Sequence, residues 1–352
     1  MKIDRGFNLY IDITSACNAS CPFCIAPTVG RADGPRFADG LRYGLDFTQK
    51  HSGSVQVTGG EPSLSRRLPS VLEEIGKRSF HRIVFNSNGC GITEELVQNL
   101  VSTGTTHVNL SRHHYDEKRN QEIMRIHPEK WSTDERFLSA IKMIHNAGIP
   151  VRINCNLLAG YIDSADEMSR FSQWCESFGV QSVAFSETFP LGVFDRQIPI
   201  ENGYAERMAV DLPSITKHLD SQYSSSCETK AACMSMWGQS NWISSFLVGG
   251  HRRFWNAPHG GEISVKTLGG WNLDGSPRPP TYSKETDQEL RDGELYFAVV
   301  HPDGIVSASW DKRERILFCP QRYLIPTEIL WTKEQSLSGY AVPLLSLNRE
   351  QT

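Results

Sequence analysis

The chain of 352 residues lacks long hydrophobic runs and an export signal. Its apolar runs are short, as in Leu295–Val300, whereas a membrane-spanning helix needs about 18 or more apolar residues. The N-terminus, which begins Met1-Lys2-Ile3, has no apolar core of the kind found in signal peptides. We therefore expect a cytoplasmic protein with no membrane partner.

An excess of charge of one sign is also missing. The 36 Lys and Arg residues nearly balance the 40 Asp and Glu residues, and the formal charge is −4. No run of about five or six like charges occurs, so we expect no nucleic-acid partner, which would need a basic face. With 39% hydrophobic and 22% charged residues, the composition is that of an ordinary globular protein.

The first 190 residues alternate short apolar, β-branched runs with helical patterns. Thr93 and Ser164 are candidate N-caps of two of the helices. This alternation is typical of an α/β fold, and six units predict a partial (β/α)6 TIM-like barrel with its site at the carboxyl ends of the strands. Strands are predicted near residues 8–14, 54–58, 81–86, 106–111, 150–158 and 181–187.

Residues 191–352 do not continue the alternation. Pairs such as Gly249-Gly250 and Pro279-Pro280 interrupt the sequence and predict a loop-rich C-terminal α+β extension that covers the barrel mouth. Within it, residues 296–309 are predicted to form a β-hairpin that turns at Asp303-Gly304. Glycine-flanked loops around Arg252 and Glu262 are candidate parts of a lid.

The nine cysteines are unevenly placed, and three of them cluster after the first predicted strand. Cys17, Cys21 and Cys24 have C-x3-C-x2-C spacing. Three thiolates on one loop can bind three irons of a cuboidal iron–sulfur cluster and leave the fourth iron open for catalysis. A structural zinc site is the alternative, but such sites normally show a second C-x2-C pair, and none follows residue 24.

This spacing, with Phe23 just before the last cysteine, resembles the signature of the radical S-adenosylmethionine (SAM) enzymes. The resemblance covers roughly residues 7–190 and implies one 4Fe-4S cluster on the three cysteines, with SAM as the second cofactor. At the end of the second strand, Gly59-Gly60-Glu61 resembles the family segment that holds the amino group of SAM. Two glycines allow close backbone approach, and a carboxylate pairs with an ammonium group.

The family pattern implies further SAM contacts at the ends of later strands. Ser87 and Asn88 follow the third strand, Ser111 ends the fourth and Asn154 lies on the fifth. Each position is equally well explained as a polar residue that bonds to the backbone at a strand end.

Candidate substrate-side groups follow the fourth and sixth strands. Arg112, His113, His114 and Tyr115 stand where many family members have a Ser-Leu-Asp type sequence. His113 and His114 are candidate acid–base residues, with structural packing as the alternative for at least one of them. Glu187, at the end of the sixth strand, is a further candidate.

The resemblance implies reductive cleavage of SAM to a 5′-deoxyadenosyl radical that abstracts hydrogen from a substrate, with an electron donor such as flavodoxin or ferredoxin as a partner. We expect a small polar metabolite of sugar or nucleoside type, with dehydration, epimerisation, dehydrogenation or decarboxylation as the outcome. The alternatives are modification of a ribosomally made peptide and a non-catalytic iron–sulfur or zinc protein. Because Cys227, Cys233 and Cys319 lack the spacing of an auxiliary cluster, we expect none, with convergence of these three thiols on a second cluster as the alternative.

Overall fold

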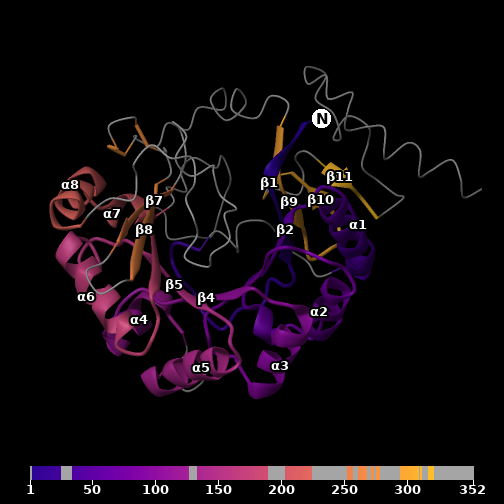
Figure 1. Ribbon diagram of the computed structural model, residues 1–352, viewed down its shortest axis with the longest axis horizontal. Helices are drawn as coiled ribbons and strands as arrows, with labels where there is room; N and C mark the ends of the chain where they lie inside the picture. The colour runs from indigo at the N-terminus through magenta and orange to yellow at the C-terminus, as the bar shows by residue number, and fades with distance from the viewer. Residues whose placement is uncertain are drawn as a thin grey trace, which may run out of the picture.

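Six parallel strands form the wall of an open barrel in the computed structural model (Figure 1). They pair in chain order, each parallel to the next. The predicted partial (β/α)6 barrel is thus confirmed, although the first strand begins at Lys2 rather than near residue 8. The strands are β1 (Lys2–Asp12), β2 (Ser54–Thr58), β3 (Ile83–Ser87), β4 (His107–Ser111), β5 (Val151–Asn156) and β6 (Ser182–Ser186). The structure describes residues 2–24, 34–126, 133–188, 203–223, 252–256, 261–267, 271–272, 275–277, 294–308, 310 and 316–320.

Helices cover the outer side of this sheet (Figure 1). Thr93 caps α3 by accepting a hydrogen bond from Leu96 N at 3.1 Å, and Ser164 caps α6 by accepting one from Glu167 N at 3.2 Å. Both caps were expected from the sequence, because a hydroxyl at this position satisfies an N–H group that the helix leaves open. The helices between the strands are α1 (Phe37–Lys50), the short η2 (Pro62–Leu64), α2 (Leu68–Gly76), α3 (Glu94–Thr103), α4 (Glu117–Met124), α5 (Asp134–Asn146) and α6 (Ala165–Glu176).

Alternation along each strand separates the apolar core from the barrel interior. On β5, Val151, Ile153 and Cys155 are buried in the core, whereas Arg152 and Asn154 line the cavity inside the barrel. Closed TIM barrels fill this space with layers of branched apolar side chains. Here the interior is polar, which leaves room for a ligand.

The C-terminal region adds strands to both edges of the barrel. The sheet order is β11-β10-β9-β1-β2-β3-β4-β5-β6-β8-β7, and it does not close. β9 and β10 pair antiparallel, which confirms the predicted hairpin around Asp303-Gly304. Arg252 and Glu262 lie on β7 and β8, not on lid loops as the sequence suggested. The added elements are α7 (Tyr204–Arg207), α8 (Leu212–Gln222), β7 (Arg252–Asn256), β8 (Glu262–Lys266), β9 (Glu294–Val300), β10 (Val306–Ser307) and β11 (Ile316–Phe318).

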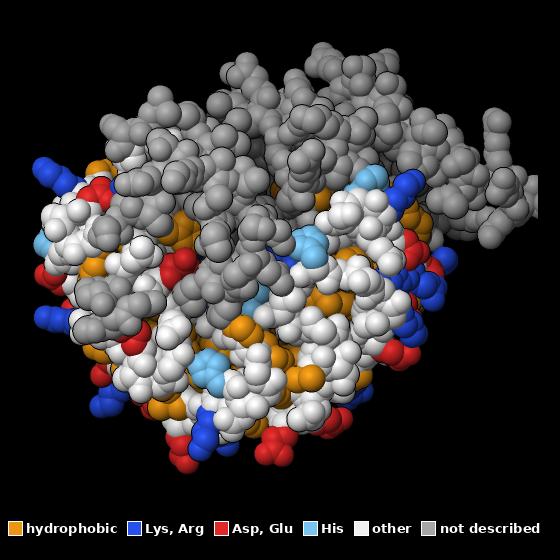
Figure 2. All heavy atoms as spheres, in the orientation of Figure 1, with side chains coloured by type: hydrophobic (Ala, Val, Ile, Leu, Met, Phe, Trp, Pro, Cys, Tyr) orange, Lys and Arg blue, Asp and Glu red, His pale blue; other side chains and the backbone are white. Residues whose placement is uncertain are grey.

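Most of the segments predicted to cover the barrel mouth lie outside the described residues, as do Cys227 and Cys233. Cys319 follows β11 and is half-buried. Within the described part of the chain, every helix is too short or too polar to cross a bilayer. On the face seen in Figure 2, acidic and basic side chains are interspersed over the outer helices.

Candidate active site

A cavity of about 780 Å³ lies inside the barrel and reaches the carboxyl ends of its strands. The candidate cofactor, metal and substrate-side residues predicted from the barrel strands all line it, except Arg112, His114, Tyr115 and Glu187. Those that line it are Cys17, Cys21, Phe23, Cys24, Gly59, Gly60, Glu61, Ser87, Asn88, Ser111, His113 and Asn154. Segments far apart in the sequence therefore meet at one place, as expected for the carboxyl ends of parallel strands.

The cysteine loop follows β1 and is fixed against the end of α4. Ser20 N donates to Met124 O at 3.1 Å, and the Cys21 thiol donates to the same carbonyl at 3.5 Å. Cys24 N donates to Cys21 O at 3.0 Å, which makes the turn between the last two cysteines. Cys17 Sγ accepts from Ala19 N at 3.4 Å. All three sulfur-bearing side chains consequently face the same cavity.

Two thiols of this loop, those of Cys17 and Cys21, have raised pKa values, so they ionise readily only when a cation binds to them. Burial, and then repulsion from nearby Glu61 and Cys24, raises the pKa of Cys17 to about 11. Burial and the neighbouring Cys24 and Cys17 also raise the pKa of Cys21. Bound iron would supply the positive charge that three adjacent thiolates need.

The donor set fits a cluster better than a single ion. In the part of the chain that the structure describes, no three His, Cys, Asp or Glu side chains are arranged around one metal-ion position. Three cysteines on one wall of a large cavity can instead take separate corners of a 4Fe-4S cluster.

The Gly59-Gly60-Glu61 turn packs directly against the start of the cysteine loop. Gly60 N donates to Thr14 O at 2.7 Å and Glu61 N donates to Ala16 O at 2.8 Å. A Cβ atom on Gly60 would lie 2.3 Å from Ala16 O, so only glycine allows this approach. Gly59 has a φ of +152°, which is also a conformation that favours glycine.

The Glu61 carboxylate joins the β2 turn to the β3 turn. Its Oε1 accepts from Ser63 N at 3.1 Å, from Ser63 Oγ at 2.6 Å and from Ser87 Oγ at 2.8 Å. Its Oε2 accepts from Asn88 N at 2.6 Å. Burial raises the pKa of Glu61, while these donors oppose that rise. The carboxylate thus positions Ser87 and Asn88, a role that the sequence did not reveal.

The remaining candidate SAM contacts surround this turn. Asn88 Nδ2 donates to Asn18 Oδ1 at 2.7 Å, so the β3 turn also holds the cysteine loop. Ser111 and Asn154 are partners in the β4–β5 register and line the cavity side by side. Ser87 is buried and its hydroxyl is used by Glu61, which fits a supporting role.

His113 is the histidine that reaches the cavity. Its Nδ1 accepts from Asn156 N at 3.0 Å, and its ring meets the Phe23 ring edge-on with centroids 4.9 Å apart. Burial, helped by the positive charge of Arg112, lowers the pKa of His113 to about 3. The neutral ring therefore carries its proton on Nε2 and can donate, but it is a poor base.

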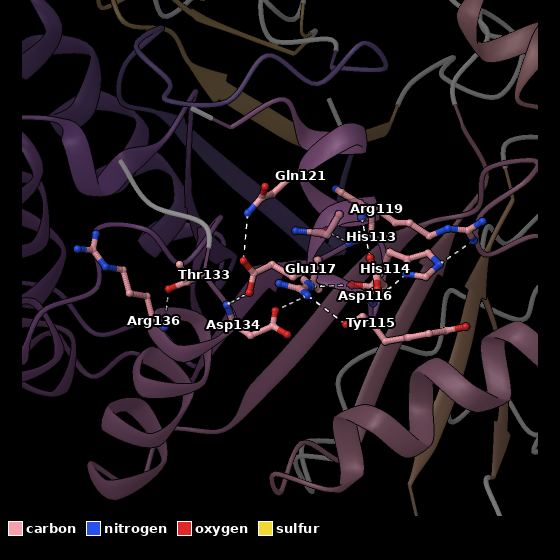
Figure 3. Close-up of polar contacts among 12 residues, drawn as sticks. His113, His114, Tyr115, Asp116, Glu117, Arg119, Gln121, Thr133, Asp134 and Arg136 are labelled. Atoms are coloured by element: carbon pink, nitrogen blue, oxygen red, sulfur yellow. Dashed lines mark hydrogen bonds and ion pairs between the residues drawn. The ribbon is translucent and has the colours of Figure 1, made fainter. Parts of the chain in front are cut away.

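The sequence neighbours of His113 do not line the cavity. Figure 3 shows the polar contacts of His114 and Tyr115 with the residues around them. His114 Nδ1 accepts from Asp116 N at 2.9 Å, and its Nε2 lies 3.3 Å from Arg119. Arg112 bonds to Asp134 at 2.6 Å, and Tyr115 donates to Glu167 at 2.9 Å. Both ring nitrogens of His114 have partners outside the cavity, so the geometry does not support the acid–base role predicted for it.

Glu187 also lies outside the cavity lining. Its carboxylate accepts from Thr267 Oγ1 at 3.1 Å, and its backbone N donates to Lys266 O at 2.9 Å. The side chain therefore ties β6 to the end of β8, and the predicted substrate contact gains no support from the geometry.

Sequence reasoning did not single out Arg82, Arg152 or Lys266, and it placed Arg252 and Glu262 on lid loops. Arg82, Arg152, Arg252, Glu262 and Lys266 all line the cavity. The alternation Arg152-Ile153-Asn154-Cys155-Asn156 carried a signal, since Arg152 shares the inward face of β5 with Asn154. Arg252, Glu262 and Lys266 needed the β6–β8 and β7–β8 pairings, which the sequence did not predict.

Comparisons with known proteins show which family model and which relatives this chain resembles. The model of the radical SAM superfamily matches residues 11–174. The GTP 3′,8-cyclase of Rhodopseudomonas palustris is 26% identical over 224 residues, which are 59% of this chain and 62% of that protein. A probable GTP 3′,8-cyclase of Metallosphaera sedula is 24% identical over 232 residues, or 61% of this chain and 68% of that protein. The chain thus spans slightly less than two thirds of the first relative.

Solved structures with a similar chain path include Streptococcus suis SuiB bound to the precursor peptide SuiA. That match has a TM-score of 0.48 and 18% identity, and it covers 61% of this chain and 45% of that chain. The structure of anSMEcpe with bound AdoMet and the Cp18Cys peptide matches with a TM-score of 0.46 and 17% identity, over 61% of this chain and 58% of that one.

Proposed function

We propose that this chain, whose residues 11–174 match the model of the radical SAM superfamily, cleaves SAM reductively and abstracts hydrogen from a small polar metabolite of sugar or nucleoside type. The cofactors characteristic of the superfamily are a 4Fe-4S cluster and SAM, as expected from the sequence. One observation carries the proposal: the three-cysteine loop and the Gly59-Gly60-Glu61 turn are hydrogen-bonded to each other beside one cavity.

The chain's own residues take on holding and positioning roles. Cys17, Cys21 and Cys24 would hold the cluster, which together with SAM supplies the electron transfer and the radical chemistry when both are bound. Glu61 orients Asn88 by accepting its backbone N–H, and its negative charge faces the cavity where the amino group of SAM would bind. His113 offers an Nε2–H donor. An electron donor such as flavodoxin or ferredoxin would deliver the electron.

The substrate class rests on two supports. The relatives are named for GTP, a nucleotide, although their identity to this chain is only 24–26%. The cavity of about 780 Å³ is lined largely by polar side chains, which suit a molecule rich in hydroxyl or charged groups.

Anaerobic reconstitution tests the proposal. We expect about four irons and four sulfides per chain, and 5′-deoxyadenosine formed from SAM in the presence of dithionite. Cys21→Ala should lose iron and product together. Cys319→Ser is the matched control, because Cys319 follows β11 and lies outside the cavity lining, and it should keep both.

Other results would favour the alternatives. Zinc without 5′-deoxyadenosine would overturn the catalytic assignment and support a structural metal site. About eight irons would indicate an auxiliary cluster and would favour peptide modification. Sugars, nucleosides and GTP would then be screened as candidates that accelerate SAM cleavage.

A further inference from the structure

We propose that the side of the cavity formed by β5, β7 and β8 binds a phosphate group of the substrate. This inference rests on the proposed function, because it concerns the molecule from which hydrogen is abstracted. Arg152, Arg252 and Lys266 line this side, and Arg82 reaches it from the start of β3. We call these four residues the cationic wall.

Strand register places Arg152 below the carboxyl ends of the strands, whereas Arg252 and Lys266 lie level with Ser186 at the end of β6. Arg152 stands two residues before Asn154 on β5, so its Cα lies about 7 Å deeper in the barrel at roughly 3.3 Å per residue. Arg252 pairs with Lys266, and its Nη1 donates to Ser264 Oγ at 2.8 Å, which aims the guanidinium into the barrel. The cysteine loop instead follows β1, several strands away in the sheet.

Among the residues that the structure describes, Arg152, Arg252 and Lys266 outnumber the carboxylates on this side of the cavity. Glu262 is the carboxylate that shares this side of the cavity, and within the described residues no ion pair shorter than 4 Å joins it to the wall. Arg152 Nε is buried and has no hydrogen-bond partner among the residues that the structure describes. An anion would satisfy this donor and relieve the repulsion between neighbouring cations.

The electrostatics of the wall agree with this geometry. Burial, and then the charges of Arg252 and Arg82, lowers the pKa of Arg152 to about 9. Burial is also the main reason that the pKa of Arg252 falls to about 10. The charge of Glu262 opposes the fall of both pKa values, and both groups stay charged at neutral pH.

The side chains favour phosphate over a single carboxylate. Guanidinium groups present planar pairs of N–H donors that match phosphate oxygens, and more than one such group meets here. A substrate anchored at the wall would extend toward the cysteine end and present its C–H bonds there. We therefore assign the wall to a phosphorylated metabolite.

Binding of pyrophosphate to the reconstituted, SAM-bound protein tests the assignment. Isothermal titration calorimetry should show a dissociation constant at least tenfold larger for Arg152→Gln and for Arg252→Gln, about 1.4 kcal/mol each. Arg42→Gln is the matched control, because Arg42 is 57% exposed on α1 and pairs with Asp39, and it should bind like the unmodified protein. Equal affinities in Arg152→Gln and Arg42→Gln would overturn the inference.

A second variant separates loss of charge from damage to the fold. Glu262→Gln should bind pyrophosphate several-fold more tightly at pH 8, since it removes the negative charge from the wall; unchanged or weaker binding contradicts the role of this charge. If SAM competes with pyrophosphate, the wall serves the carboxylate of SAM and the inference fails. SAM cleavage in the absence of substrate is measured on the same samples. Cleavage without pyrophosphate binding would refute only the phosphate-binding role of the wall, whereas absence of cleavage would refute the proposed function.

Discussion

Replacing Gly60 with alanine should separate the two loops that build the site. The new Cβ atom would lie 2.3 Å from Ala16 O, 2.7 Å from Ala16 C and 2.9 Å from Ser15 O. These are backbone atoms, so no side-chain rotation can relieve the overlap. Restoring an ordinary contact requires a movement of about 1 Å, and the cysteine loop begins at the very next residue, Cys17.

The magnitude follows from the bonds that this movement breaks. Gly60 N and Glu61 N donate to Thr14 O and Ala16 O at 2.7 and 2.8 Å. Each bond contributes about 0.5–1.5 kcal/mol, so the free energy of unfolding should fall by about 1–3 kcal/mol. Because the same movement displaces the cysteine loop, iron content and 5′-deoxyadenosine formation should fall as well.

Urea unfolding of the protein before reconstitution, followed by iron determination after it, measures both effects. Gly76→Ala is the control, since the nearest atom to its Cβ is 3.7 Å away and alanine is the better helix former at the end of α2. It should unfold at an equal or higher urea concentration. If Gly60→Ala unfolds like Gly76→Ala and binds about four irons, the close approach of the loops is not what shapes the site.

Three further predictions concern single ionisable groups. Glu61→Gln should lower the free energy of unfolding by about 1–3 kcal/mol, because both carboxylate oxygens of Glu61 accept backbone N–H bonds and an amide nitrogen cannot accept one. Unchanged stability and SAM affinity in this variant would refute the positioning role. His113 has a folded-state pKa of about 3, so its contribution to the free energy of unfolding is complete above pH 6.5 and is lost as the pH falls toward 3. His113→Asn should therefore reduce the slope of the free energy of unfolding against pH by up to about 1.4 kcal/mol per pH unit in that window. A pH dependence of the urea midpoint equal to that of the unmodified protein would contradict this. Sulfate should bind the cationic wall less tightly as the pH rises from 6 to 9. Glu262, with a pKa raised to about 7 by burial, becomes negatively charged over this range and repels the anion. A flat profile by calorimetry would count against this.

Local signals in the sequence determined much of the fold and one half of the site. The hydroxyls of Thr93 and Ser164 cap the helices predicted after them, because a cap depends only on residues within one turn. The cysteine loop could also be predicted from the sequence, since its three thiols lie within eight residues and the loop follows a strand. Parallel strands bring their carboxyl ends together, so Gly59-Gly60-Glu61 could be placed beside that loop from strand order alone.

Tertiary structure decided where side chains near these motifs point and what they contact. His113 and His114 are adjacent in the sequence, yet one lines the cavity and the other bonds to Asp116 and Arg119 behind it. Nothing local distinguishes them, because the difference depends on how the chain leaves β4 and packs α4.

The cationic wall depended on tertiary structure most strongly. Arg152 and Arg252 are 100 residues apart in the sequence. They line the same cavity because β8 pairs with β6, and β7 pairs with the other edge of β8. Strand pairing over such separations is set by burial of whole faces and by hydrogen bonds along the sheet edge, not by any short motif. The sequence therefore determined the resemblance to radical SAM enzymes and the cysteine loop, while the folded sheet alone determined which charges line the cavity.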